Sequence, residues 1–264
     1  MLKIQGVHKT FNPGTINEKK ALCGIDLTLN DGDFVTVIGG NGAGKSTLLN
    51  MITGVYPVDC GSIVIDDIDV TKLPEHKRAK YFGRVFQDPM TGTAAAMEIE
   101  ENMALAARRG KPSTLKPGVT KAERAEFKKL LAKLDLGLED RLTSKVGLLS
   151  GGQRQAITLL MATMQNPKLL LLDEHTAALD PQTAAKVLAL TDELVGERKL
   201  TTLMITHNMK DAIRLGNRLI MMYDGKIVYD IEGEEKKKLK VSDLLELFAK
   251  VSGGEFANDR MLLS

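Results

Sequence analysis

The chain has 264 residues, which is enough for one large α/β domain or two small ones. Hydrophobic residues make up 43% of it, and 36 basic residues nearly balance 34 acidic ones to leave a formal net charge of +2. This balance argues against a dedicated nucleic-acid-binding protein, which would concentrate far more positive charge.

Membrane segments and disulfides are not expected. No apolar run approaches the roughly 18–20 residues that a membrane-spanning helix needs, and the N-terminus lacks the apolar region of a signal peptide. We therefore expect a soluble, intracellular chain that relies on other chains for any membrane-spanning part. Cys23 and Cys60 lack metal-ligand spacing, so we expect reduced thiols in the core.

The first part of the chain predicts antiparallel β-structure. The expected strands are 2–7, 21–30, 62–65 and 81–86. In the second of them, Ile25, Leu27 and Leu29 alternate with polar residues, as in a strand with one buried face. A turn is expected at 12–15, where asparagine, proline and glycine follow one another.

A glycine-rich loop lies between an apolar run at 34–38, which predicts a buried strand, and a helical segment at 48–52. Its spacing fits the phosphate-loop pattern G-x-x-x-x-G-K-[ST]. Glycines let successive N–H groups surround a phosphate, and the helix adds its positive dipole end. Lys45 adds a charge for the β- and γ-phosphates, and the Ser46 hydroxyl can ligate Mg²⁺. The expected nucleotide-binding residues are Gly39, Asn41, Gly42, Ala43, Gly44, Lys45, Ser46 and Thr47. The alternative is a glycine-rich turn beside a surface lysine.

The sequence changes character over about 90–149. Helical composition occupies 94–107 and 121–136, and the basic link between them, 108–121, is rich in helix breakers and is expected to be exposed and mobile. We interpret 89–149 as a helical subdomain inserted into an α/β core. The predicted parts of the chain are a single domain over 1–250, its core over 1–88 and 150–232, and a short helical tail over 233–264.

The core is expected to resume after residue 149. The predicted elements are a helix at 150–165, a strand at 169–173, a helix at 181–198, a strand at 201–206, and a hairpin of 218–223 with 226–230 around Asp224-Gly225. Asp180 is placed to cap the second helix, and Pro181 is tolerated in its first turn.

Two further motifs carry chemistry. Asp173 and Glu174 follow a run of four leucines, at the strand end where α/β folds place ligands. An aspartate there can hold Mg²⁺, and the glutamate can orient or deprotonate an attacking water. The segment 150–153 begins a helix with a serine and two glycines, which makes a second anion-binding helix terminus. The alternatives are an acidic pair that only caps the next segment and an ordinary serine-capped helix.

Taken in order, these motifs resemble those of the ATP-binding subunits of ABC transporters over residues 3 to about 230. The matches are Phe11 with the adenine-stacking aromatic, Gly39–Thr47 with the Walker A loop, Gln87 with the Q-loop, Leu149–Gln153 with the LSGGQ signature, Asp173-Glu174 with Walker B, Ala178–Asp180 with the D-loop, and His207 with the switch histidine. Taken singly, Phe11 is also compatible with a strand-edge residue, Gln87 with a solvated loop and His207 with a structural histidine.

The resemblance implies an α/β fold with a P-loop NTPase (RecA-like) core, an antiparallel β subdomain and an inserted α-helical subdomain. It implies that the chain binds ATP and Mg²⁺ and hydrolyses ATP in a head-to-tail dimer. The implied catalytic residues are Glu174 as general base, with His207, Lys45 and Gln87; the implied Mg²⁺ ligands are Ser46, Gln87 and Asp173. Phe11 would stack on adenine. The second copy would supply Ser150, Gly151, Gly152, Gln153 and Asp180 to each nucleotide.

Two residues depart from the family pattern. Gly40 and His175 each stand where the family commonly has proline, the second immediately after Glu174. A histidine there restores an N–H donor and backbone freedom beside the expected base. His8, His76 and His175 are given no catalytic role.

The resemblance further implies a peripheral ATPase at the cytoplasmic face of the cell membrane. Its partners would be a second copy of itself, transmembrane permease subunits and a solute-binding protein, without nucleic acid. The Asp-Glu-His-Thr segment resembles that of some bacterial amino-acid uptake ATPases, including those for aromatic amino acids. Met90, Met97 and Ile99 are the expected permease-docking residues, or else core. The alternatives are an ATPase for lipoprotein release or cell division, and a soluble ABC ATPase acting on ribosomes or DNA.

Overall fold

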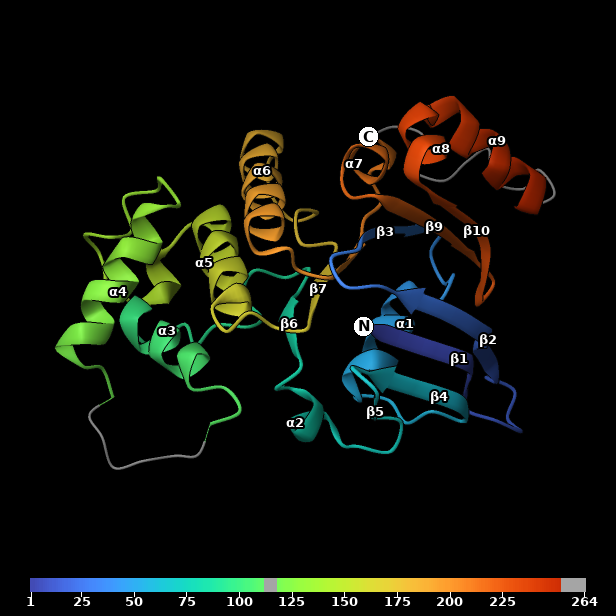
Figure 1. Ribbon diagram of the computed structural model, residues 1–264, viewed down its shortest axis with the longest axis horizontal. Coiled ribbons are helices and arrows are strands. Elements are labelled where there is room, and N and C mark those ends of the chain that lie inside the picture. Colours follow the sequence, from blue (N-terminus) through green and yellow to red (C-terminus); the bar gives the residue numbers. More distant parts are fainter. Residues whose placement is uncertain (112–117, 253–264) are drawn as a thin grey trace.

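The computed structural model describes residues 1–111 and 118–252, whose strands form two sheets (Figure 1). The smaller, antiparallel sheet has the strand order β2-β1-β4-β5. Its strands are β1 (Leu2–Phe11), β2 (Lys19–Leu29), β4 (Cys60–Ile65) and β5 (Ile68–Asp69). β1 is longer than predicted and reaches Phe11, so this aromatic ring stands at the end of a strand.

The larger sheet has the order β10-β9-β3-β8-β7-β6 and is parallel except for the β9–β10 hairpin. Its strands are β3 (Phe34–Gly39), β6 (Phe82–Val85), β7 (Leu169–Asp173), β8 (Thr202–Ile205), β9 (Arg218–Tyr223) and β10 (Lys226–Glu232). The four leucines of β7 are all buried, as expected for an inner parallel strand covered on both faces. The predicted α/β fold with an added antiparallel sheet and a helical part is confirmed.

Helices surround the sheets and also gather at the two ends of the molecule, α3 and α4 at one and α7 to α9 at the other (Figure 1). They are α1 (Lys45–Thr53), α2 (Glu75–Arg78), α3 (Ile99–Ala107), α4 (Lys121–Ala132), α5 (Gly151–Thr163), α6 (Pro181–Arg198), α7 (Met209–Arg214), α8 (Gly233–Lys238) and α9 (Val241–Ser252). Among the described residues, none of these helices is both long and apolar enough to cross a membrane.

Helix α5 packs against two parts of the protein. Ile157 and Leu160 belong to a buried cluster with α3 and α4, whereas Leu159 and Ala162 belong to the cluster that covers the larger sheet with α6. Helix α5 therefore joins the buried cluster of α3 and α4 to the buried cluster that covers the larger sheet. The division of the chain at residues 88, 149 and 232 stays a prediction.

Several local predictions were wrong. Helix α3 begins at Ile99 instead of residue 94, because Glu98 and Glu101 form a capping box, and α4 ends at Ala132, three residues before Asp135 takes a left-handed φ of 51°. Ile99 is fully buried and therefore is not a docking residue. Both cysteines are free, but Cys60 is exposed and Cys23 half-buried, so they are not core thiols. Within the link predicted to be mobile, 112–117 lies outside the described residues.

Candidate functional site

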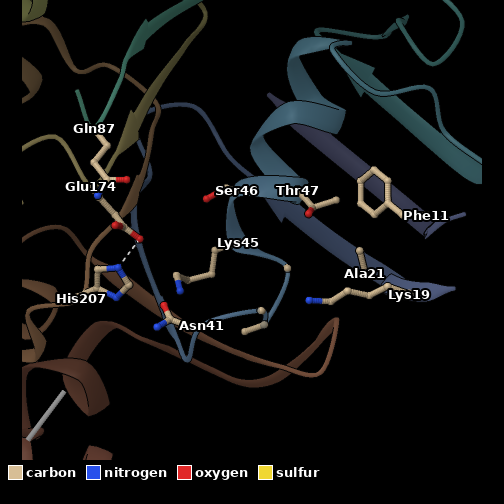
Figure 2. Close-up of a pocket in the computed structure, with 13 residues that line it drawn as sticks. Phe11, Lys19, Ala21, Asn41, Lys45, Ser46, Thr47, Gln87, Glu174 and His207 are labelled. Carbon is tan, nitrogen blue, oxygen red and sulfur yellow. Dashed lines mark ion pairs between the residues drawn. The ribbon is translucent and has the colours of Figure 1, made fainter. Parts of the chain in front are cut away.

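A pocket of about 560 Å³ opens between the loop after β3 and the edge of the smaller sheet (Figure 2). Its volume lies in the range of small-molecule sites. It is lined by Phe11, Lys19, Ala21, Asn41, Gly42, Ala43, Gly44, Lys45, Ser46, Thr47, Gln87, Glu174 and His207. Five separate stretches of the chain therefore meet at the predicted phosphate loop.

The loop requires glycine at three positions. Gly42 and Gly44 have φ angles of 81° and 99°, which residues with a Cβ rarely adopt. A Cβ on Gly44 would lie 2.5 Å from the Ala21 carbonyl oxygen, and one on Gly39 would lie 2.4 Å from that of Met222. Helix α1 starts at Lys45 directly after Gly44, which has no side chain to cap it. The first N–H groups of α1 are thus available to an anion in the pocket.

The Lys45 side chain is held inside this loop, with 6% of its surface exposed. Its ammonium donates to the Gly39 and Gly40 carbonyl oxygens at 2.7 and 3.1 Å, and the side chain points into the pocket (Figure 2). Burial lowers the pKa of Lys45, an effect that the nearby Glu174 and Asp173 oppose. Because an ammonium has three donors, one remains for a phosphate oxygen.

Glu174 and His207 meet because they follow neighbouring parallel strands, β7 and β8. The His207 Nε2 atom lies 2.6 Å from the Glu174 Oε1 atom (Figure 2). The Glu174 N–H donates to the Ile205 carbonyl oxygen at 3.0 Å, and its φ is 46°, in the left-handed region. Non-glycine residues in this region cluster at functional sites.

Asp173 is the last residue of β7 and does not line the pocket, but its carboxyl lies near enough to the Ser46 hydroxyl for that group to favour its ionised form and lower its pKa. Burial raises the pKa of this carboxyl, opposed by Arg84, whose Nη2 atom lies 3.4 Å from Asp173 Oδ2. The described residues contain no group of three His, Cys, Asp or Glu that would hold a metal alone. One hydroxyl and one carboxylate nevertheless suit Mg²⁺, which takes its other ligands from phosphates and water. The residues therefore fit magnesium bound together with a nucleotide.

The signature residues lie elsewhere. Ser150 Oγ accepts from the Gln153 N–H at 3.3 Å, and Gln153 Oε1 accepts from the Ser150 N–H at 3.2 Å, so the serine caps this helix, as in the alternative interpretation of this segment. Asp180 caps α6 through the Thr183 N–H at 3.0 Å, as predicted. The predicted site residues that do not line the pocket are Gly39, Ser150, Gly151, Gly152, Gln153, Asp173 and Asp180. Of these, Gly39 and Asp173 contact pocket residues, and the others form a second group.

Lys19 and Ala21 line the pocket and Arg84 contacts Asp173, and none of the three was predicted from the sequence. Lys19 pairs with Phe11 across the β1–β2 ladder, and its side chain extends toward the phosphate loop (Figure 2). The turn at 12–15 indicated a hairpin. Because β1 and β2 pair with three register shifts, however, counting residues from the turn does not show which residue of β2 lies opposite Phe11. Arg84 contacts Asp173 from the neighbouring strand β6, which only the sheet order reveals.

Comparison with known proteins decides the family. The family model described as "ABC transporter" matches residues 22–177. The chain belongs to this family. It is 44% identical to the tyrosine transport ATP-binding protein of Clostridioides difficile (strain R20291), over 94% of this chain and 98% of that protein. It is 37% identical to a methionine import ATP-binding protein of Pseudomonas entomophila (strain L48), over 86% of this chain and 66% of that protein.

Solved structures of ABC cassettes share this fold. One is a dimeric ATP-binding cassette in a post-hydrolysis state bound to ADP and Pi, with a TM-score of 0.75 and 29% identity over 88% of this chain and 98% of that chain. Another is a transporter cassette in its ADP conformation, with a TM-score of 0.76 and 30% identity over 94% and 98%. This ABC ATPase thus binds and hydrolyses ATP with Mg²⁺, forms a dimer and works with membrane permease subunits.

Proposed function

We propose that this ATPase drives the import of an amino acid, with tyrosine as the first candidate, from the cytoplasmic face of the membrane and with a solute-binding protein as a further partner. The proposal of tyrosine as the cargo rests on the 44% identity to a tyrosine transport ATP-binding protein over nearly the whole of both chains. The match covers 98% of the tyrosine relative but only 66% of the methionine import relative, which extends well beyond the region that it shares with this chain. We therefore give the tyrosine relative more weight.

Each ATP site is proposed to combine two copies. The pocket supplies the phosphate loop, Phe11, Glu174 and His207, while the glycine-rich terminus of α5 lies outside it. An anion-binding terminus that does not line its own pocket is explained if Ser150, Gly151, Gly152 and Gln153 meet the nucleotide of the other copy. Asp180, at the start of α6, is assigned to the same shared surface.

Within one copy, the proposed roles follow from position. The loop N–H groups, Lys45 and Thr47 hold the phosphates, and Phe11 stacks on the adenine. Ser46, Asp173 and Gln87 hold Mg²⁺, which neutralises charge on the phosphates when it is bound. Glu174 takes the proton of the attacking water, and His207, at 2.6 Å from its carboxylate, keeps that carboxylate oriented.

Transport by the purified complex tests the function. We would purify this chain with the permease subunits that bind it, reconstitute the complex in liposomes with its solute-binding protein, and measure ATP-driven uptake of labelled tyrosine, with labelled methionine in parallel. We expect tyrosine uptake that needs ATP and that Glu174→Gln abolishes while ATP binding persists. Faster methionine uptake would contradict the proposed cargo, and rapid ATP turnover by Glu174→Gln would contradict its role as base.

A further inference from the structure

Helix α6 carries one polar residue in its buried face. The buried residues of the helix are Val187, Leu188, Thr191, Leu194 and Val195. The Thr191 hydroxyl donates to the Val187 carbonyl oxygen at 2.8 Å, one turn back, and lies 3.0 Å from His175 Nε2. Because a hydroxyl has a single proton and this one is directed to Val187, we assign the proton of the imidazole to Nε2, from which the Thr191 oxygen accepts.

The partner of this hydroxyl is buried as well. His175 has 2% of its surface exposed, and burial lowers its pKa to about 4. A buried donor and a buried acceptor that satisfy each other fix the relative position of the segments that carry them.

That position matters because His175 directly follows Glu174. The left-handed backbone of Glu174, with φ of 46°, persists in a non-glycine residue only where surrounding contacts impose it. Before Glu174, the ladder between β7 and β8 supplies its N–H bond to Ile205. At its side chain, His207 binds the carboxylate. In the segment that follows Glu174, the His175 side chain bonds to Thr191 of α6.

We propose that His175 is a positioning residue for ATP hydrolysis: its hydrogen bond to Thr191 ties the segment after Glu174 to α6 and so holds the Glu174 carboxylate toward the pocket. This inference rests on the proposed role of Glu174 as base. Helix α6 also packs against α5, the helix that begins with the signature residues. The same hydrogen bond thus connects the carboxylate to the helices that begin at the surface proposed for the second copy.

Two matched pairs of variants test the bond in the full-length chain. Thr191→Val keeps the shape of the side chain and removes the hydroxyl, whereas Thr191→Ser keeps the hydroxyl. His175→Leu removes the donor, whereas His175→Gln places an amide nitrogen near the position of Nε2. We expect Thr191→Val and His175→Leu to lower kcat for ATP about 10- to 100-fold with KM changed less than about threefold. Thr191→Ser and His175→Gln should retain most of kcat.

The combined variant gives the sharpest measurement. If both residues act through one bond, Thr191→Val with His175→Leu should lower kcat no further than either change alone. A kcat near that of the wild type in Thr191→Val, or an equal loss in Thr191→Val and Thr191→Ser, overturns the inference. If Thr191→Val does not fold, the His175 pair measures the same contact. Glu174→Gln, assayed alongside, distinguishes failure of the proposed base from failure of its positioning. Rapid turnover by that variant would show that Glu174 is not the base, whereas slow turnover would leave only the role of His175 in question.

Discussion

Two helices in the described part of the chain have N-termini rich in glycine, and these termini differ in what they face. At α1, no side chain caps the helix, the loop bends through Gly42 and Gly44, and the N–H groups meet a pocket that holds Lys45. At α5, Ser150 and Gln153 cap each other and the terminus lies away from that pocket. The first terminus is built to bind an anion within its own chain. The second is complete as a helix start, with Gly151 exposed and Gly152 buried.

The largest effect is expected at the α5 terminus, where a substitution should lower ATP hydrolysis without changing ATP binding. Ser150→Arg should leave ATP binding to the single chain unchanged but lower hydrolysis about 100- to 1,000-fold, as when a donor to a reacting group is lost. ATP affinity and steady-state turnover measure the two properties. Thr120→Arg is the matched control, because Thr120 caps α4 with the same capping box away from the proposed interface. Full activity of Ser150→Arg would refute the shared site.

The α5 terminus needs glycine at position 152 because α6 packs closely against it. A Cβ on Gly152 would lie 2.0 Å from the Thr183 Cγ2 atom of α6. Gly152→Ala should therefore lower the free energy of unfolding by about 1–3 kcal/mol through overpacking, measured by denaturant titration. Thr183→Ser removes that methyl group, so the double variant should recover most of the loss. If it recovers nothing, packing against α6 is not the reason for this glycine.

At the pocket beside α1, ATP affinity is expected to depend on Phe11. Its ring packs edge-on against Tyr56, with centroids 5.1 Å apart, and also lines the pocket. Phe11→Ala should weaken ATP binding by about 1–3 kcal/mol if the ring stacks on the base, whereas Phe11→Tyr should bind almost normally. Isothermal titration with ATP measures both variants. An unchanged affinity of Phe11→Ala would make the ring a strand-edge residue only.

The smallest expected effect belongs to Lys19. Its ammonium lies 3.3 Å from the position of a Cβ on Gly42, so it adds positive charge beside the loop. Lys19→Met should weaken ATP binding about two- to fivefold, as for an exposed ion pair, and should leave adenosine binding unchanged. Lys20→Met is the control, since Lys20 is the next residue along the same strand and does not line the pocket. Equal losses in the two variants would show a general charge effect.

The local elements could be predicted from the sequence where neighbouring residues determine them. The capping residue Asp180 was correctly predicted, because a cap bonds only to the first turn of its own helix. Residues 94–98 were wrongly included in α3, because helical composition does not show which of several acidic residues will form the capping box. Ile99 was expected either to dock a permease or to lie in the core, and it lies in the core, since only packing decides which side of a short helix is buried.

The phosphate loop, its lysine and the acidic pair at the end of β7 are made of residues that are contiguous in the sequence, so the sequence alone determined them. The sheet order decided the rest. It brings Glu174 to His207 and Arg84 to Asp173 from separate strands, and the β1–β2 ladder brings Lys19 to Phe11. It also decides that only one of the two glycine-rich termini faces the pocket, because the direction in which a helix start points depends on the packing of the whole domain.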